Sequence, residues 1–126
     1  MLETGIKGYA ETFTEEENTA LAMGSGNLEV FATPAMIALM EQAASESVQP
    51  QLAENESSVG TLMNVKHLKA TLVGKTVTAE STLTEIDGRR LVFKVAARDS
   101  SGVIGEGVHE RFIVDSEKFM SRANQK

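Results

Sequence analysis

The chain has 126 residues, a length at which one domain buries roughly two-thirds of its unfolded surface. Hydrophobic residues make up 41% and charged residues 24%, the balance of a folded globule rather than of a disordered chain. Lys and Arg total 12 against 18 Asp and Glu, and this net charge of −6 argues against binding to nucleic acid or to an anionic membrane. We therefore expect one domain spanning residues 1–126.

Targeting and metal-binding signals are missing from the sequence. The start, MLETGIKG, has no basic segment followed by an apolar one, and no stretch approaches the ~20 apolar residues of a membrane span. Without cysteine there is no disulfide, no thiolate metal site and no cysteine nucleophile, which leaves His67 and His109 as the imidazoles. We expect a cytoplasmic protein without a metal site.

The N-terminal part is predicted to contain one strand and a turn. Gly5–Phe13 has the composition of a strand, and Thr14 with Glu17 matches the spacing of a capping box for a short turn. A flexible Gly24-Ser25-Gly26 stretch follows.

The segment bracketed by Pro34 and Pro50 is predicted to be a helix of about four turns. Thr33 offers a capping hydroxyl, and proline suits the first helical position. Apolar and small residues then recur at helical spacing: Met36, Ile37, Met40, Ala44, Ser47 and Val48. We expect Pro50 to end this helix.

The second half is predicted to form an antiparallel meander. Residues alternate between faces over 59–67, 77–83 and 91–97, Asp87-Gly88 is a strong hairpin signal, and a last strand runs from about Val103 to Val114. With the strand before the helix, this makes an α+β domain whose helix lies on one face of a five-stranded sheet. Because one helix leaves such a sheet partly uncovered and its edges free, we expect a homodimer that pairs through strand edges.

Glu41 interrupts the apolar side of the predicted helix. On a helical wheel it lies between Ile37, Ala44 and Val48 rather than beside the polar Gln42. Burial there would raise the pKa of the carboxyl group, as expected of a general base or acid. The alternative is a carboxylate at the margin of the stripe that reaches solvent or a salt bridge.

His67 is the corresponding anomaly on the sheet. It is in phase with Met63 and Val65 on the presumed inner face, where a histidine is either a satisfied core residue or a catalytic group. Because the helix packs on the sheet, Glu41 and His67 are candidates for one site.

Three further positions have two interpretations. Thr33 is sufficiently explained as a cap, and Gly60 is either a turn residue or a source of an unobstructed N–H for an oxyanion. Gly105 and Gly107, in phase with His109, indicate either close approach of a backbone or ligand, or a bulge.

As a set, these segments resemble the fluoroacetyl-CoA thioesterase-like family of hotdog-fold proteins. The resemblance covers about Val30 to Val114 and is carried by VFATPAMIALMEQAA, by SSVGTLMNVKHLKATLVGKTVTAESTLTEIDGRRLVFKVAARD and by GVIGEGVHERFIV. It implies a hotdog fold, in which a long helix is wrapped by a five-stranded antiparallel sheet, and a dimer that hydrolyses acyl-CoA thioesters to the free acid and CoA.

The resemblance also implies roles for individual residues. The family's active-site threonine, glutamate and histidine fall on Thr33, Glu41 and His67, and its oxyanion-side glycine and substrate-side arginine fall on Gly60 and Arg111. Glu41 then either activates water or attacks the carbonyl, while His67 moves the proton. CoA is part of the substrate, and no separate cofactor or metal is implied.

The substrate is expected to differ from that of the specialised family member. An aromatic-lined lid ahead of the helix is associated with fluoroacetyl-CoA discrimination, whereas TALAMGSGNLEV has no aromatic residue. We therefore expect a short or medium acyl-CoA. The alternatives are a noncatalytic acyl-CoA or small-acid binding protein on the same fold, and an enoyl-CoA hydratase or dehydratase, for which an Asp would be expected on the helix.

Overall fold

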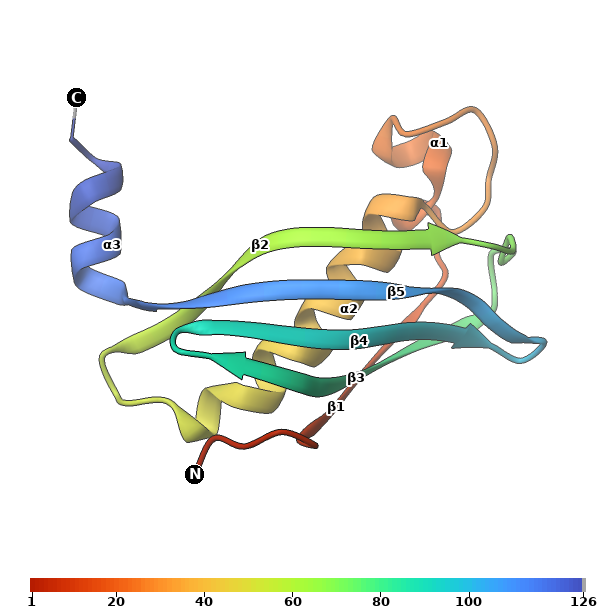
Figure 1. The fold of residues 1–126 in the computed structure, drawn as a ribbon. Coiled ribbons are helices and arrows are strands. Elements are labelled where there is room, and N and C mark those ends of the chain that lie inside the picture. Colours follow the sequence, from red (N-terminus) through yellow and green to blue (C-terminus); the bar gives the residue numbers. More distant parts are fainter. Residues whose placement is uncertain (126) are drawn as a thin grey trace.

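A long helix wrapped by a curved antiparallel sheet is the main feature of the computed structural model, which describes residues 1–125 (Figure 1). The strands are β1 (Lys7–Phe13), β2 (Glu56–His67), β3 (Thr76–Asp87), β4 (Arg90–Asp99) and β5 (Gly102–Asp115). The helices are α1 (Ala20–Met23), α2 (Thr33–Val48) and α3 (Ser116–Ala123), with 3-10 turns at Glu16–Asn18 and Gln49–Gln51. The predicted hotdog arrangement is confirmed, and α3 is an element that the sequence interpretation missed.

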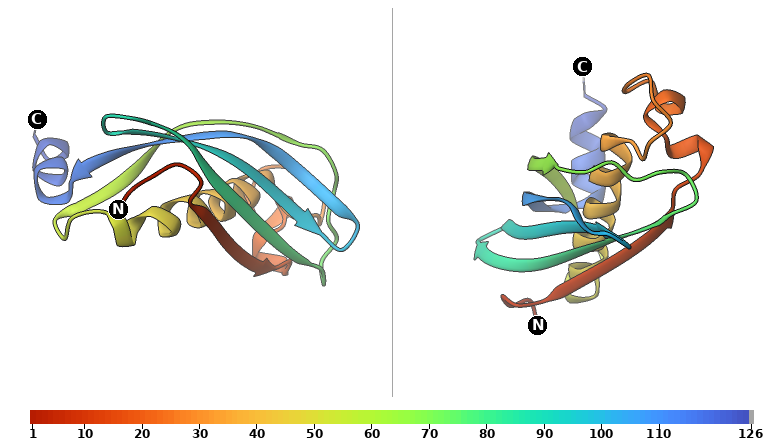
Figure 2. Two further views of the ribbon diagram at one scale, coloured as in Figure 1. Left: turned by 60° about the horizontal axis from the view of Figure 1, so that its bottom comes forward. Right: turned by 90° about the vertical axis from the view of Figure 1, so that its right-hand side faces the viewer.

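The strand order β1-β3-β4-β5-β2 puts the strand before α2 and the strand after it at opposite edges of the sheet. All four pairings are antiparallel, and the sheet curls around α2 (Figure 2). β2 is therefore an edge strand that pairs with β5 on one side only. This free edge borders the site described below.

The core lies between α2 and the concave face of the sheet. The helix buries one side, formed by Met36, Leu39, Met40, Ala43, Ala44 and Val48. The sheet contributes alternating residues of its central strands, including Val77, Ala79, Leu83, Leu91, Phe93, Val95 and Ala97. The periodicities of these strands are as predicted, whereas the buried side of the helix also includes Leu39 and Ala43, and the predicted Ile37 and Ser47 are only partly buried. Among the helices of residues 1–125, none has the length and apolar character needed to cross a membrane.

Thr33 does not cap α2, contrary to the prediction. Ala32 occupies the N-cap position without a side-chain hydrogen bond, and Thr33 is the first helical residue. Pro34 follows in the first turn, where a missing N–H costs no intrahelical hydrogen bond. The hydroxyl of Thr33 is thereby free to turn toward the sheet.

The predicted capping box is also displaced by one residue. Glu15 and Asn18 form the reciprocal pair at the 3-10 turn, and Thr19 caps α1 by accepting a hydrogen bond from the N–H of Ala22. Thr14 is instead buried, and its backbone bonds to Gly74 and Lys75.

An irregularity in β2 changes which side chains face the helix. The register with β5 shifts between Gly60 and Leu62, as in a β-bulge. Gly60 therefore pairs with Arg111 and Met63 with His109 on the inner face, while Val59 pairs with the partly exposed Phe112. The prediction that Val59 shares a face with Met63 and His67 is wrong, because the extra residue reverses the alternation.

Candidate active site

Glu41 lies where α2 faces the bulged part of β2. Its Oε2 accepts a hydrogen bond from Nη1 of Arg111 at 3.1 Å, in an ion pair, and the side chain is 41% exposed. The carboxylate therefore lies at the margin of the apolar side of the helix and forms a salt bridge. This is the alternative that the helical wheel had left open. The expected desolvation of Glu41 is absent in a single chain.

Arg111 is itself firmly held by the edge strand. Its Nε donates to Oγ of Ser58 at 2.8 Å and its Nη2 to the carbonyl oxygen of Ser58 at 2.9 Å. Burial lowers the pKa of Arg111, opposed by Glu41, but a guanidinium stays charged. A buried arginine anchored in this way fixes the position of one oxygen of Glu41.

His109 completes this network, and the sequence interpretation gave it no role. Its Nδ1 lies 2.8 Å from the carbonyl oxygen of Leu62, which can only accept, so Nδ1 carries the proton. Nε2 then accepts from Nη1 of Arg111 at 3.1 Å. Burial, with 1% of the side chain exposed, lowers the pKa of His109; the Leu62 carbonyl opposes this and the charge of Arg111 adds to it. The imidazole is thus kept neutral as an acceptor.

The signal for His109 was present in the sequence. His109 and Arg111 are two residues apart on one strand and so share a face. Nothing in that spacing revealed the carbonyl of Leu62, which the bulge aligns with the imidazole. We refer to Glu41, Ser58, His109 and Arg111 as the Glu41 cluster.

Glycines leave the space that this cluster and its strand need. A Cβ built on Gly60 would come within 3.0 Å of Oε2 of Glu41, a separation that real Cβ atoms essentially never show. On β5, a Cβ on Gly105 would meet Sδ of Met36 at 2.5 Å, and one on Gly107 would meet the carbonyl oxygen of Asn64. Close approach is confirmed for both glycines, and the register between β4 and β5 also shifts directly before Gly105, as in a bulge.

Thr33 and His67 form a second polar contact. Oγ1 of Thr33 lies 2.8 Å from Nδ1 of His67, which faces inward as predicted. Burial lowers the pKa of His67, only partly offset by the backbone of Lys69. Its Nε2 is buried, and no group within residues 1–125 hydrogen-bonds it. A pocket of about 290 Å³ adjoins the pair, lined among others by Ala20, Val30, Leu68 and Lys69.

The two groups of residues do not meet within one chain. Thr33 and Glu41 are eight residues apart on α2, which corresponds to about 12 Å along the helix axis. Within residues 1–125, neither a hydrogen bond nor an ion pair joins Glu41 to His67. A single chain therefore does not join these two side chains.

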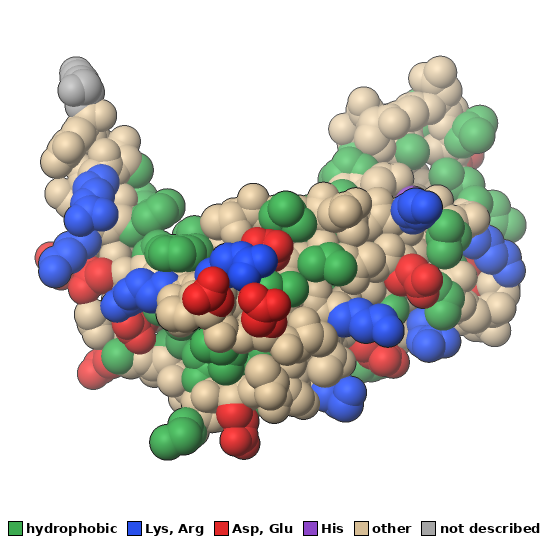
Figure 3. All heavy atoms as spheres, in the orientation of Figure 1, with side chains coloured by type: hydrophobic (Ala, Val, Ile, Leu, Met, Phe, Trp, Pro, Cys, Tyr) green, Lys and Arg blue, Asp and Glu red, His purple; other side chains and the backbone are tan. Residues whose placement is uncertain are grey.

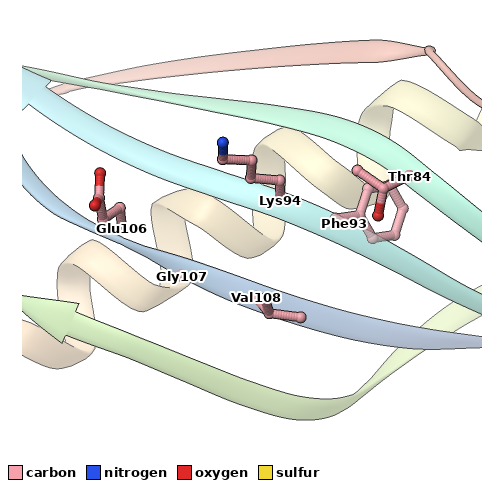
Figure 4. Close-up of a pocket in the computed structure, with 6 residues that line it drawn as sticks. All are labelled: Thr84, Phe93, Lys94, Glu106, Gly107 and Val108. Atoms are coloured by element: carbon pink, nitrogen blue, oxygen red, sulfur yellow. The ribbon is translucent and has the colours of Figure 1, made fainter.

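Other parts of the surface carry fewer side chains that could act in catalysis. A depression of about 380 Å³ on the sheet face away from α2 is lined by Thr84, Phe93, Lys94, Glu106, Gly107 and Val108 (Figure 4). It contains one lysine and one carboxylate but neither histidine. Over residues 1–125, no group of three or more possible metal-ligating side chains is arranged around a common centre.

Comparisons with known proteins identify the family of the chain. The family described as FlK, fluoroacetyl-CoA-specific thioesterase, matches residues 14–117. The fluoroacetyl-CoA thioesterase of Streptantibioticus cattleyicolor is 44% identical over 98 residues, which cover 78% of this chain and 70% of that enzyme.

Solved structures of relatives superpose over nearly the whole chain. The structure of the fluoroacetyl-CoA thioesterase FlK has a TM-score of 0.93 at 34% identity and covers 100% of this chain and 98% of its own. A mutant of FlK in complex with acetyl-CoA has a TM-score of 0.93 at 33% identity, with 98% of each chain covered. A thioesterase superfamily member from Thermus thermophilus has a TM-score of 0.89 at 27% identity, covering 98% of this chain and 91% of its own.

These similarities span the residues that carry the site. The matched region contains Thr33, Glu41, Gly60, His67 and Arg111, and the helix-in-sheet architecture is shared throughout. The chain belongs to the fluoroacetyl-CoA-specific thioesterase family of hotdog-fold acyl-CoA thioesterases.

Proposed function

We propose that the protein hydrolyses acyl-CoA thioesters to the free acid and CoA, with Thr33, Glu41 and His67 as catalytic residues. The observation that carries the proposal is that the Glu41 cluster and the Thr33–His67 pair each hold only part of the expected catalytic residues. Glu41 is oriented by Arg111 at an open strand edge, and His67 has a buried ring nitrogen without a partner. The Thr33–His67 pair lies beside an open pocket, and no carboxylate within residues 1–125 hydrogen-bonds either side chain.

A homodimer brings the two groups of residues together. In an antiparallel pairing of β2 with its copy, centred on Asn64 and with the bulged Thr61 left out of the count, Gly60 faces His67 of the partner subunit. Both residues point to the inner face, as directly opposite residues of an antiparallel pair must. On α2, a centre at Ile37 likewise sets Glu41 beside Thr33 of the partner subunit. Each site is then made of Glu41 from one subunit and the Thr33–His67 pair from the other.

The chemistry follows from the positions of the polar atoms. Oε2 of Glu41 is occupied by Arg111, so Oε1 either removes a proton from water or attacks the thioester carbonyl carbon. His67 transfers the proton, and the hydroxyl of Thr33 contacts its Nδ1. The C–S bond breaks and CoA leaves as a thiolate, a good leaving group. Both routes give one acid and one CoA per water.

Gly60 and Arg111 have supporting roles. Gly60 lies beside the carboxylate, on the side where the oxyanion of the tetrahedral intermediate forms. Arg111 is a positioning residue, because it reaches Glu41 and is otherwise enclosed by Ser58 and His109.

The substrate class is a short or medium acyl-CoA. The relatives named above include enzymes described as specific for fluoroacetyl-CoA. In this chain the segment over the Thr33–His67 pocket, residues 20–30, contains no aromatic side chain. Phe31 also lines this pocket, but next to it Ala20, Val30 and Leu68 offer aliphatic surface that can bury the methylenes of saturated acyl groups, which favours longer chains over fluoroacetate.

The direct test is release of free thiol from a panel of acyl-CoA esters, from acetyl to decanoyl with fluoroacetyl included. The chain has no cysteine, so a thiol reagent reports CoA alone. We expect Glu41→Gln and His67→Ala to lower kcat by orders of magnitude, with Glu46→Gln on the same helix as the matched control. CoA-ester binding without turnover by the wild-type chain would instead support the binding-protein alternative.

Subunit mixing tests the composite site separately. Glu41→Gln and His67→Ala chains, unfolded and refolded together, form mixed dimers in which one of the two sites keeps both native groups. Because half of randomly mixed dimers are mixed, about one-quarter of the wild-type activity should return. No recovery, although light scattering shows dimers, would contradict a site shared between subunits.

A further inference from the structure

Two projections rise from opposite ends of the β2 edge. One is the α1 projection, residues 20–30, near the end of β2 at His67, and the other is α3, beyond the end of β5 (Figure 1). In the space-filling view they stand on either side of a saddle, with hydrophobic side chains at the base of α3 and around the α1 projection (Figure 3). The saddle is where the proposed dimer places the second subunit.

Both projections expose large apolar side chains to water. On α3, Met120 is 57% exposed and Phe119 41%; around the α1 projection, Leu28 is 69%, Leu72 62% and Leu68 57% exposed. A neighbourhood this rich in exposed leucine and methionine is typical of an interaction surface. Leu72 joins the projection through a bridge with Val30.

The apolar residues of α3 form one stripe. At about 100° per residue, Phe119, Met120 and Ala123 share one side of the helix, and Ser121 lies opposite. Within its own chain α3 packs on the end of β5, and a pocket of about 260 Å³ stays open between them. An amphipathic helix that is so little covered needs a further surface to bury its stripe.

Antiparallel pairing of β2 brings the two projections of different subunits together. Glu56, at the start of β2, pairs with Asp115, from which α3 begins. The two-fold relation sets this end of one subunit beside the residues that follow His67 in the other, where Leu68, Leu72 and the α1 projection lie. Within one chain the same two projections lie far apart (Figure 1).

We infer that α3 of each subunit packs its Phe119–Met120 side against the α1 projection of the partner and walls the pocket of the partner's Thr33–His67 pair. The inference rests on the proposed dimer. Charge agrees with this docking, because α3 carries Lys118 and Arg122 against one acidic residue, Glu117, whereas Glu29 is the charged residue of the α1 projection. The pocket beside Thr33 and His67 is open in one chain and gains its missing wall from the second.

Disulfide trapping tests the contact, since the chain contains no native cysteine. Met120→Cys is combined in turn with Leu28→Cys, Leu68→Cys and Leu72→Cys, and each protein is oxidised mildly. We expect at least one pair to give a covalent dimer. Each single cysteine variant, and the pair Met120→Cys with Tyr9→Cys on the opposite sheet edge, should stay uncrosslinked. Absence of crosslinking in all three pairs, in a protein that light scattering shows to be dimeric, overturns the inference.

Kinetics test the consequence for the site. Met120→Asp should raise the KM for an octanoyl-CoA substrate about ten-fold, the scale of one large apolar side chain lost from a contact, and leave kcat within about two-fold. Ser121→Asp, on the opposite side of α3, should change neither constant. An unchanged KM in Met120→Asp would refute the inference that α3 forms a wall of the partner's pocket. A monomeric wild-type chain would instead refute the dimer, and an inactive wild-type dimer the proposed hydrolysis.

Discussion

Replacing Gly60 by alanine should remove most of the activity and leave the fold intact. The new Cβ would lie within 3.0 Å of Oε2 of Glu41, whereas ordinary van der Waals contact begins at 3.4 Å. Its other neighbours, Nη1 of Arg111 and Cε1 of His109, are both at 3.4 Å and need not move. The carboxylate therefore has to retreat by about 1 Å, and a displacement of that size from a productive geometry costs about 100-fold in rate. This equals about 2.7 kcal/mol of transition-state stabilisation.

Thiol release and urea unfolding together test this reasoning. Gly60→Ala should lower kcat/KM about 100-fold while its free energy of unfolding stays within about 1 kcal/mol of the wild type. Glu41→Asp draws the carboxylate back by one methylene, so Gly60→Ala should cost less in that background than in the wild type. A stable Gly60→Ala protein with full activity would refute the steric argument. An equal loss in both backgrounds would show that Gly60 acts through the substrate and not through Glu41.

Three further predictions concern stability and the polar network. Gly8→Ala places a Cβ against the carbonyl oxygen of Ala43, a backbone atom that cannot turn aside. The substitution should lower the free energy of unfolding, measured in urea, by about 1–3 kcal/mol. A variant as stable as the wild type would contradict this. His109→Gln keeps an acceptor for Arg111, whereas His109→Asn keeps only a donor for the Leu62 carbonyl. The kcat should therefore fall less in the glutamine variant than in the asparagine variant. The reverse order would refute the assigned tautomer. Because burial lowers the pKa of His109, the unfolded chain binds a proton below about pH 6.5 that the folded chain does not. Stability should therefore fall from pH 7 to pH 5.5, and less steeply in His109→Gln.

Most of the fold was predictable because its signals are local. The alternation of strands β3 and β4, the Asp87-Gly88 hairpin and the helical spacing between the prolines all depend on neighbours a few residues apart. Interpretation failed where one residue can act in two ways. Thr33 has the side chain of a cap, yet the helix starts one residue earlier and its hydroxyl contacts His67.

The bulge in β2 was not predictable for a related reason. Strict alternation assigned Val59 and Met63 to one face, and only the pairing with β5 reveals the extra residue. That residue aligns the carbonyl of Leu62 with His109 and allows Gly60 to sit beside Glu41. The glutamate was recognisable on the wheel and Arg111 through the family resemblance, but the contacts of Arg111 with Glu41 and His109 became visible only in the paired strands.

The separation of Glu41 from His67 shows most clearly what a helical wheel leaves out. A wheel places Thr33 and Glu41 within about 80° of each other, on the same side of α2, but discards the distance of about 12 Å along the axis. Residues on one side of a helix are therefore candidates for one site only if a second element spans that distance. In this chain His67 reaches Thr33 at the start of the helix, and Arg111 reaches Glu41 near its middle, so the two places each hold half of the proposed catalytic set. A two-fold axis reverses one helix against the other, which is why a pair of identical chains can build from these halves two complete sites.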